Sequence, residues 1–358
     1  MAASRASSLL ACTLLMGGPA GATTADTKPA APEDCTPSGV LQFLCGPSRV
    51  EDVVPISGRR ALVGSSAADP AGSRPGALLL IDTASRTSAP LAIRTTSKPK
   101  SPYAGCPGPP DLAKLAPHGL AIRALSAGHE ALYVVNHGGR ESIEIFDLSS
   151  AGSHVALDWI GCAVLPTGAS GNGVAPLPDG GFVASKFLDT TRGAMVPQLA
   201  SGEKNGVAYR WSPHSGFTIL EGSEGVGDNG IEVSQDGRWV FVNIWGEKKI
   251  VRLALAGSDA PRSIAVPFLP DNIHRAADGS LIVTGQVADL PDLPACFAAN
   301  CPLDWEVDRL DPLSLKRSVL LHQKGSHAFN GASGAVQIGH ELWVASVFSN
   351  RLAIVRKP

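Results

Sequence analysis

Three segments of the chain share one pattern, and this repeat limits the folds open to the chain more than any other feature. Each segment has an Asn or Asp, an apolar run, an Asp-Gly pair and a second apolar run, and the segments begin at Asn172, Asn229 and Asp271. An Asp-Gly pair between two apolar runs is typical of a tight β-hairpin. The repeat therefore predicts a series of hairpin-based units of one kind.

The length of the repeat predicts the architecture. The three segments begin 57 and 42 residues apart, and His118 and Glu51 extend the spacing toward the N-terminus. Units of this size made of short strands are typical of four-stranded β-propeller blades, and the span 51–358 holds about six of them. The 39 glycines and 28 prolines suit a turn-rich all-β chain. We expect an all-β, six-bladed β-propeller over residues 45–358, with no helix after residue 50 and an N-terminal strand that completes the last blade.

The polar residue that starts each unit has a defined place in such a fold. The first strand of a propeller blade is the innermost, so its leading end faces the central tunnel. Side chains that are far apart in the sequence can then meet at one axial point. The members of this predicted ring are Glu51, His118, Asn172, Asn229, Asp271 and Asn272.

The chemistry of the ring predicts a calcium site. Calcium binds six to eight oxygen ligands and accepts carboxylates and amides together. No cluster of thiolates or imidazoles indicates zinc or copper. A single Asn-Gly or Asp-Asn pair is an ordinary turn sequence, but recurrence at one blade position favours ligation. The expected calcium ligands are Glu51, Asn172, Asn229, Asp271 and Asn272.

Two histidines stand at predicted strand ends beside glycine. His118 occurs in Ala-Pro-His-Gly and His137 in Val-Asn-His-Gly. Histidine accepts and returns protons near neutral pH, and glycine leaves space around a side chain at the rim of a cavity. Two surface or capped histidines would have the same local pattern. With the ring beside them, the pair predicts base catalysis next to a cation.

Several motifs together resemble the serum paraoxonase/arylesterase family. They are segments 116–119, 134–137, 228–231, 234–237, 271–273 and 331–348, with the acidic pair Glu51-Asp52 before the first blade. Their order over residues 45–356 carries the resemblance, since no single motif is decisive. The gluconolactonase/regucalcin and strictosidine synthase-like propellers share the fold but usually lack the two histidine motifs.

The resemblance implies hydrolysis of lactones or aryl esters with calcium in the tunnel. It assigns the five oxygen-bearing ring residues to a catalytic calcium, and His118 and His137 to a histidine dyad. It also implies a second, structural calcium at Asp52 and at the backbone carbonyl near Leu120. Where the family has a further aspartate for that ion, this chain has Gly173, so the expected second site lacks a ligand.

The N-terminus has the pattern of a secretory signal. Arg5 precedes a short apolar run, and small residues follow up to Ala25. We expect a signal peptide over residues 1–25, cleaved after Ala22 or Ala25, and a flexible segment over 26–44. The apolar run is too short to span a bilayer. A lipoprotein box ending at Cys12 is the lesser alternative to a periplasmic or released protein.

Six of the seven cysteines follow the predicted signal. An even number of cysteines in an exported chain predicts disulfides, although six cysteines allow fifteen pairings. Proximity in the sequence favours Cys35 with Cys45 and Cys296 with Cys301, which leaves Cys106 with Cys162.

The composition limits the partners. A net charge of −2 gives no basic excess for nucleic acid or an anionic membrane surface. We expect a small lactone or ester substrate, no nucleic acid and no transmembrane segment, while the oligomeric state stays open. Two alternatives remain: a non-catalytic binding propeller with a structural calcium, and a gluconolactonase or strictosidine synthase-like enzyme.

Overall fold

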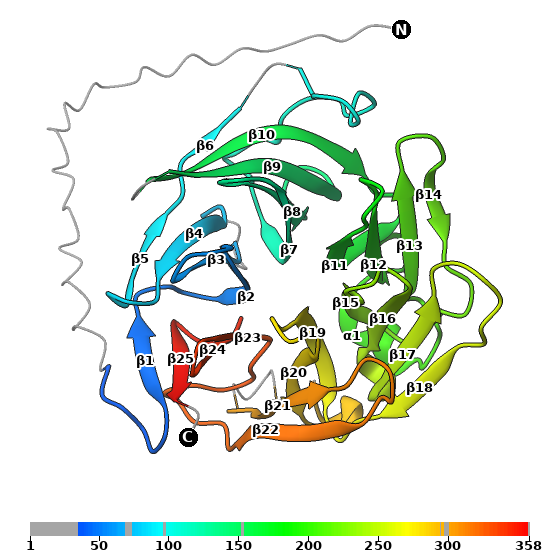
Figure 1. Ribbon diagram of the computed structural model, residues 1–358. Helices are drawn as coiled ribbons and strands as arrows, with labels where there is room; N and C mark the ends of the chain where they lie inside the picture. The colour runs from blue at the N-terminus through cyan, green and yellow to red at the C-terminus, as the bar shows by residue number, and fades with distance from the viewer. Residues whose placement is uncertain are drawn as a thin grey trace, which may run out of the picture. The chain divides into compact units, whose positions relative to one another are not determined.

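The computed structural model describes residues 35–68, 74–95, 98–151, 154–293, 295–296 and 301–356. These residues form six sheets arranged around a central axis (Figure 1). The expected six-bladed β-propeller is confirmed. The predicted signal peptide over 1–25 and most of the predicted flexible segment lie outside the described residues.

Each of blades 1 to 5 is built from strands that follow one another in the chain. Blade 1 contains β2 (Val50–Pro55), β3 (Ala61–Ser66), β4 (Ala77–Asp82) and β5 (Thr87–Pro90). Blade 2 contains β6 (Ile93–Arg94), β7 (Pro117–Ser126), β8 (His129–Asn136), β9 (Ser142–Ala151) and β10 (His154–Val164). Blade 3 contains β11 (Ala169–Pro176), β12 (Phe182–Asp189), β13 (Val207–Ser212) and β14 (Gly216–Ile219). Blade 4 contains β15 (Asp228–Val233), β16 (Trp239–Ile244), β17 (Lys249–Ala254) and β18 (Arg262–Ala265). Blade 5 contains β19 (Leu269–Arg275), β20 (Leu281–Val287), β21 (Asp304–Leu310) and β22 (Arg317–Gln323).

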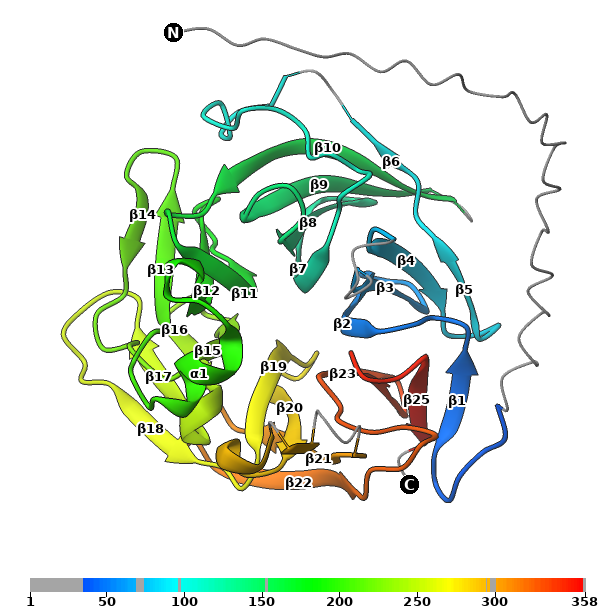
Figure 2. The same cartoon turned by 180° about the vertical axis from the view of Figure 1, so that it is seen from behind.

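Blade 6 joins the two ends of the described chain. It contains β23 (Gly334–Ile338), β24 (Glu341–Ala345), β25 (Arg351–Arg356) and, as its outer strand, β1 (Gln42–Cys45). β1 pairs with β25 in antiparallel register, with Gln42 opposite Ile354 (Figures 1 and 2). The N-terminal strand thus completes the last blade, as the sequence predicted.

Many of the inner strands read as largely apolar runs because both faces of a blade are buried against neighbouring blades. In β16, Val240 and Val242 pack into the core between blades 3 and 4, while Phe241 packs into the core between blades 4 and 5. Alternate residues of a strand point to opposite faces, so one strand supplies two cores.

Short helices occur only in connections between the described strands. They are α1 (Met195–Ala200), η1 (Thr190–Arg192), η2 (Trp245–Glu247) and η3 (Leu290–Asp292). The expectation of no helix was wrong for α1, a six-residue helix on the face of the ring shown in Figure 2. No helix in the described part of the chain is both long and apolar enough to cross a membrane.

Three disulfides follow the favoured pairing. Cys35 is bonded to Cys45, Cys106 to Cys162, and Cys296 to Cys301. The first ties the segment before β1 to the end of that strand, and the second ties the long β6–β7 connection to β10.

Candidate metal centre

In blades 1 to 5, the repeated polar residue occupies a β-bulge. The register of the innermost strand shifts between Val50 and Asp52 in β2, Pro117 and Leu120 in β7, Gly171 and Val174 in β11, Asp228 and Ile231 in β15, and Pro270 and Ile273 in β19. A bulge redirects the side chain that it contains. The residues inside these five bulges are the predicted ring: Glu51, His118, Asn172, Asn229, and Asp271 with Asn272.

Four contacts join the inner strands of blades 2 to 6 in sequence around the axis. The Cα of Gly119 lies against the backbone oxygen of Asn172, because a Cβ at Gly119 would overlap that atom. A Cβ at Gly173 would lie 2.9 Å from the backbone nitrogen of Ile231, and one at Gly230 would overlap the backbone oxygen of Asp271. Next, the backbone N–H of Asn272 donates to the carbonyl of Ser333 at 3.0 Å, just before β23.

Two further contacts close the ring through blade 1. The Ser333 hydroxyl donates to the Glu51 carbonyl at 2.6 Å. The Leu120 N–H donates to Asp52 Oδ2 at 2.8 Å, which joins β2 to β7. Every pair of adjacent inner strands is thus in contact around the axis.

Side chains of the ring also meet one another. The Asn272 amide donates to Glu51 Oε1 at 2.7 Å, and His118 Nε2 lies 3.5 Å from the same oxygen. Glu51 and Asn272 are 1% and 3% exposed, so these contacts are shielded from bulk water.

Buried oxygens without partners test whether the ring suits a hard cation. Glu51 Oε2, Asn172 Oδ1 and Asn229 Oδ1 are buried and accept no hydrogen bond. A buried polar atom without a partner is unfavourable, and a cation would satisfy several such oxygens at once. Among the described residues, no three His, Cys, Asp or Glu side chains form a metal cluster, so a cation at the ring would need amide oxygens as well. The residues present therefore fit a calcium-type site of mixed carboxylates and amides.

Electrostatics support the same interpretation. Burial, and then the charges of Asp52 and Asp271, raise the pKa of Glu51 well above its ordinary value. Burial raises the pKa of Asp271 to about 7, although hydrogen bonds from Gln286 and Asn229 oppose this shift. Both carboxylates are thus disfavoured as anions in the protein alone. A bound divalent cation would reverse this, because an opposite charge nearby stabilises the ionised form.

The two predicted histidines lie next to each other. Their ring centroids are 5.0 Å apart, and the rings meet edge to face. Burial, followed by the nearby His137, lowers the pKa of His118 well below its ordinary value. His118 is therefore neutral at neutral pH and can accept a proton.

Glu141, which the sequence analysis missed, orients His137. Its two carboxylate oxygens lie 3.0 and 2.9 Å from His137 Nδ1. A carboxylate accepts from a ring N–H, so Nδ1 carries the hydrogen and the lone pair of a neutral ring lies on Nε2. Glu141 is four residues from His137, at the other end of the same β8–β9 connection, and only that spacing could have indicated it.

Asp52, expected at a second calcium, already has partners in the protein. His274 Nε2 lies 2.6 Å from Asp52 Oδ1, and the N–H groups of Val53 and Leu120 also donate to this carboxylate. Burial disfavours a charged His274, but Asp52 outweighs it and raises the His274 pKa. Leu120 presents its N–H here rather than a carbonyl. Both carboxylate oxygens of Asp52 thus already accept hydrogen bonds within the chain.

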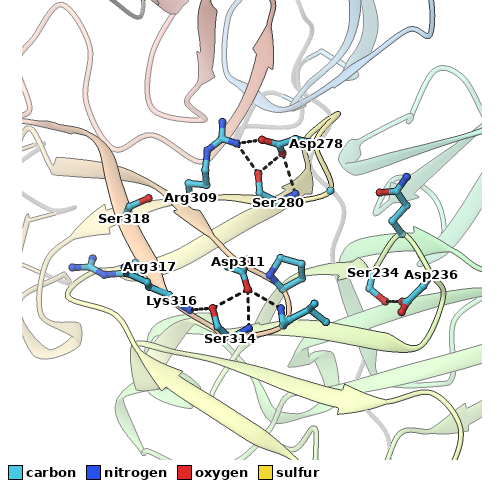
Figure 3. Close-up of a pocket in the computed structure, with 14 residues that line it drawn as sticks. Ser234, Asp236, Asp278, Ser280, Arg309, Asp311, Ser314, Lys316, Arg317 and Ser318 are labelled. Carbon is cyan, nitrogen blue, oxygen red and sulfur yellow. Dashed lines mark hydrogen bonds and ion pairs between the residues drawn. The ribbon is translucent and has the colours of Figure 1, made fainter.

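A cavity lined by outer turns of blades 4 and 5 contains none of the ring residues. It has a volume of about 760 Å³ and is lined by the turns that follow β15 and β19, at the opposite ends of these strands from the bulges. Several of its charged groups are engaged within the chain, as in the Arg309–Asp278 pair and the Asp311 turn with Ser314 (Figure 3).

Comparisons with known proteins identify the fold. Neither family models nor curated proteins match the chain. Among solved structures, a luciferin-regenerating enzyme is 13% identical, with a TM-score of 0.52 over 88% of this chain and 95% of that chain. The calcium-binding protein regucalcin of Agrobacterium tumefaciens is 12% identical, with a TM-score of 0.51 over 89% and 94%. The periplasmic gluconolactonase of Pseudomonas aeruginosa is 15% identical, with a TM-score of 0.50 over 87% and 81%. The chain therefore shares the fold of the gluconolactonase and regucalcin propellers.

Proposed function

We propose that this protein is a calcium-dependent hydrolase of lactones or aryl esters, related in its site to the paraoxonase/arylesterase family. The observation that carries the proposal is the set of three unpartnered buried oxygens, Glu51 Oε2, Asn172 Oδ1 and Asn229 Oδ1, with a neutral histidine beside them. One part can hold a hard cation and the other can accept a proton, and His118 Nε2 lies 3.5 Å from Glu51 Oε1.

The ring residues would hold the ion through their oxygens. Calcium bound there would polarise the carbonyl of the substrate and stabilise the oxyanion that forms on it. Glu51 and Asp271 supply two negative charges, which balance the charge of the ion, while Asn172, Asn229 and Asn272 add neutral oxygens.

His118 would act as the general base. It accepts a proton from water as the water oxygen bonds to the carbonyl carbon, and it returns that proton to the alkoxide or phenoxide when the ester bond breaks. The His137 lone pair on Nε2 can hold the water or relay its proton, because Glu141 fixes the hydrogen on Nδ1. The products are a carboxylic acid and an alcohol or phenol.

The disulfides support a location outside the cytoplasm. Three disulfides suit an extracellular or periplasmic location. We propose that residues 1–25 direct export and that the substrate is a small molecule that enters the tunnel.

The test is hydrolysis of a panel of lactones and aryl esters by purified protein, in calcium and in EGTA. We expect turnover that chelation abolishes and that His118→Gln lowers by about 10²- to 10⁴-fold, the usual contribution of a general base. His129→Gln is the matched control, because His129 is half exposed and pairs with Asp147 on blade 2. Absence of turnover on every substrate in excess calcium would refute the proposal.

A sugar lactone is the second candidate substrate class, because a periplasmic gluconolactonase is among the structural neighbours. Selective hydrolysis of aldonolactones, with aryl esters untouched, would favour it. A non-catalytic binding propeller predicts calcium-dependent melting without any turnover.

A further inference from the structure

Gln286 holds one carboxylate of the ring from the second strand of blade 5. Its Nε2 donates to Asp271 Oδ2 at 2.7 Å and to the Ala332 carbonyl at 2.9 Å. Gln286 is 2% exposed, so these bonds have no competition from bulk water. The Asp271 backbone is held separately, since the Asn243 amide donates to its carbonyl at 2.6 Å.

Trp245 determines which way the Gln286 amide points. The Trp245 indole Nε1 lies 3.0 Å from Gln286 Oε1. An indole N–H can only donate, and the two other neighbours of the amide, Asp271 Oδ2 and the Ala332 carbonyl, can only accept. Only one orientation of the amide satisfies all three partners.

Trp245 also packs against two of the short helices that connect strands, α1 and η3. We call α1, η3 and Leu293, the residue that follows η3, the lid. Lid residues Leu199 and Leu293 are 3% exposed and belong to the same apolar cluster as Trp245. A cavity of about 20 Å³ between α1 and η3 has Trp245 in its lining, and Phe187 packs edge to face on the indole at 5.8 Å.

We propose that Trp245 and Gln286 are positioning residues that couple packing of the lid to cation affinity at the ring. The inference rests on the proposed function, because it assumes that Asp271 is a calcium ligand. Lid contacts fix the indole, the indole fixes the Gln286 amide, and the amide fixes the Asp271 carboxylate. Groups that orient a metal ligand commonly change metal affinity by 10- to 100-fold when they are removed.

The experiment measures calcium binding by titration calorimetry on chelator-stripped full-length protein. Trp245→Phe keeps an aromatic ring under the lid but removes the N–H donor, and Gln286→Met removes the amide. We expect both variants to bind calcium about 10- to 100-fold more weakly than the parent protein. Leu293→Ala, which does not touch the ring, should weaken binding in the same direction.

Trp305→Phe is the matched control. Trp305 is fully buried, and its Nε1 has no hydrogen-bond partner. This variant therefore makes the same change from indole to phenyl without removing a hydrogen bond. Its calcium affinity should stay within about threefold of the parent. The melting temperature of each calcium-free variant separates a general loss of stability from a specific loss of affinity, since a merely structural role would lower melting and leave the affinity unchanged.

The outcomes separate this inference from the proposed function. If the parent protein binds no calcium, both the coupling and the proposed function are refuted. If the parent binds calcium and Trp245→Phe binds as tightly as Trp305→Phe, the coupling is refuted and the proposed function stands.

Discussion

Single glycines allow the axial ring to form. Gly119, Gly173 and Gly230 each follow a ring residue, and at each of them a Cβ would press against the backbone of the next inner strand. These glycines therefore allow adjacent inner strands to approach closely at the bulges, which no larger residue would permit.

The change Gly119→Ala tests this close approach. The added Cβ would overlap the Asn172 backbone oxygen, and we expect a loss of about 1–3 kcal/mol of unfolding free energy, typical of overpacking, together with weaker calcium binding. Gly105→Ala is the control, because nothing lies within 4 Å of a Cβ there. Equal melting temperatures of the two variants would contradict the close contact.

A buried carboxylate in blade 5 predicts how stability depends on pH. Asp308 is 1% exposed; burial raises its pKa to about 7, with Glu306 adding to the shift and Arg317 opposing it. Because the folded protein binds this proton more tightly than the unfolded chain does, the contribution of Asp308 to stability falls as pH rises from about 4 to about 7.

The change Asp308→Asn should remove this loss. Relative to the parent protein, we expect the variant to gain on the order of 1–3 kcal/mol between pH 5 and pH 8, measured by urea unfolding at both pH values. Asp278→Asn should show no such gain, because hydrogen bonds from Ser280 hold the pKa of Asp278 below its ordinary value. An identical pH dependence of Asp308→Asn and the parent would overturn the assignment.

Residue types identified the ring but not the groups that support it. Glu51, Asn172, Asn229 and Asp271 could be predicted because the same position recurs in successive blades. His274 could not, because its partner Asp52 is 222 residues away and nothing in the local sequence marks the pair.

At the scale of elements, apolar runs predicted the strands better than the connections. The run 239–244 is apolar except for Asn243 and is buried along its whole length, and such runs indicate buried strands. The lid helix α1 has only six residues, MVPQLA, too few to show a helical period. Gln286 and Trp245 were missed for a related reason: each occurs once, outside the repeated position.

Linkage between the lid and the ring predicts a change in proteolysis. Arg192 and Lys204 flank α1 and are exposed, so trypsin can cleave beside the lid. Coupling between binding free energies is reciprocal, so if lid packing tightens calcium binding, bound calcium should also stabilise the packed lid and slow these cleavages. Mass spectrometry of a tryptic time course, with calcium and with EGTA, measures both rates.

Cleavage after Arg60 provides the internal reference. Arg60 is exposed in the β2–β3 turn, away from the lid, and it reports on global unfolding. Calcium protection that is equal at Arg60 and at the lid would mean that the ion acts only on global stability.

For the whole molecule, one strand decides whether the ring is closed. β1 is the outer strand of blade 6 and pairs with β25 over four residues. Leu44 of β1 is 6% exposed and packs into the core between blades 6 and 1, with Trp343 and Ile354. The closed arrangement could be predicted because the repeat leaves the last blade one strand short.

Leu44→Ala should therefore destabilise the entire propeller. We expect a loss of about 2–5 kcal/mol, as for other buried leucines, seen as one cooperative shift of thermal unfolding by circular dichroism. Val40→Ala is the control, since Val40 is 59% exposed. A separate early transition confined to β1 would contradict closure as a global constraint.

The pairing of β1 with β25 also fixes an order of events during synthesis. The sheets of blades 1 to 5 can assemble as the chain emerges, because their strands are consecutive. β1 is made before all of them and must wait for β25, the last of the described strands in chain order. A product that stops early keeps an unpaired edge on its final sheet, and quality-control proteases can recognise it as unfinished.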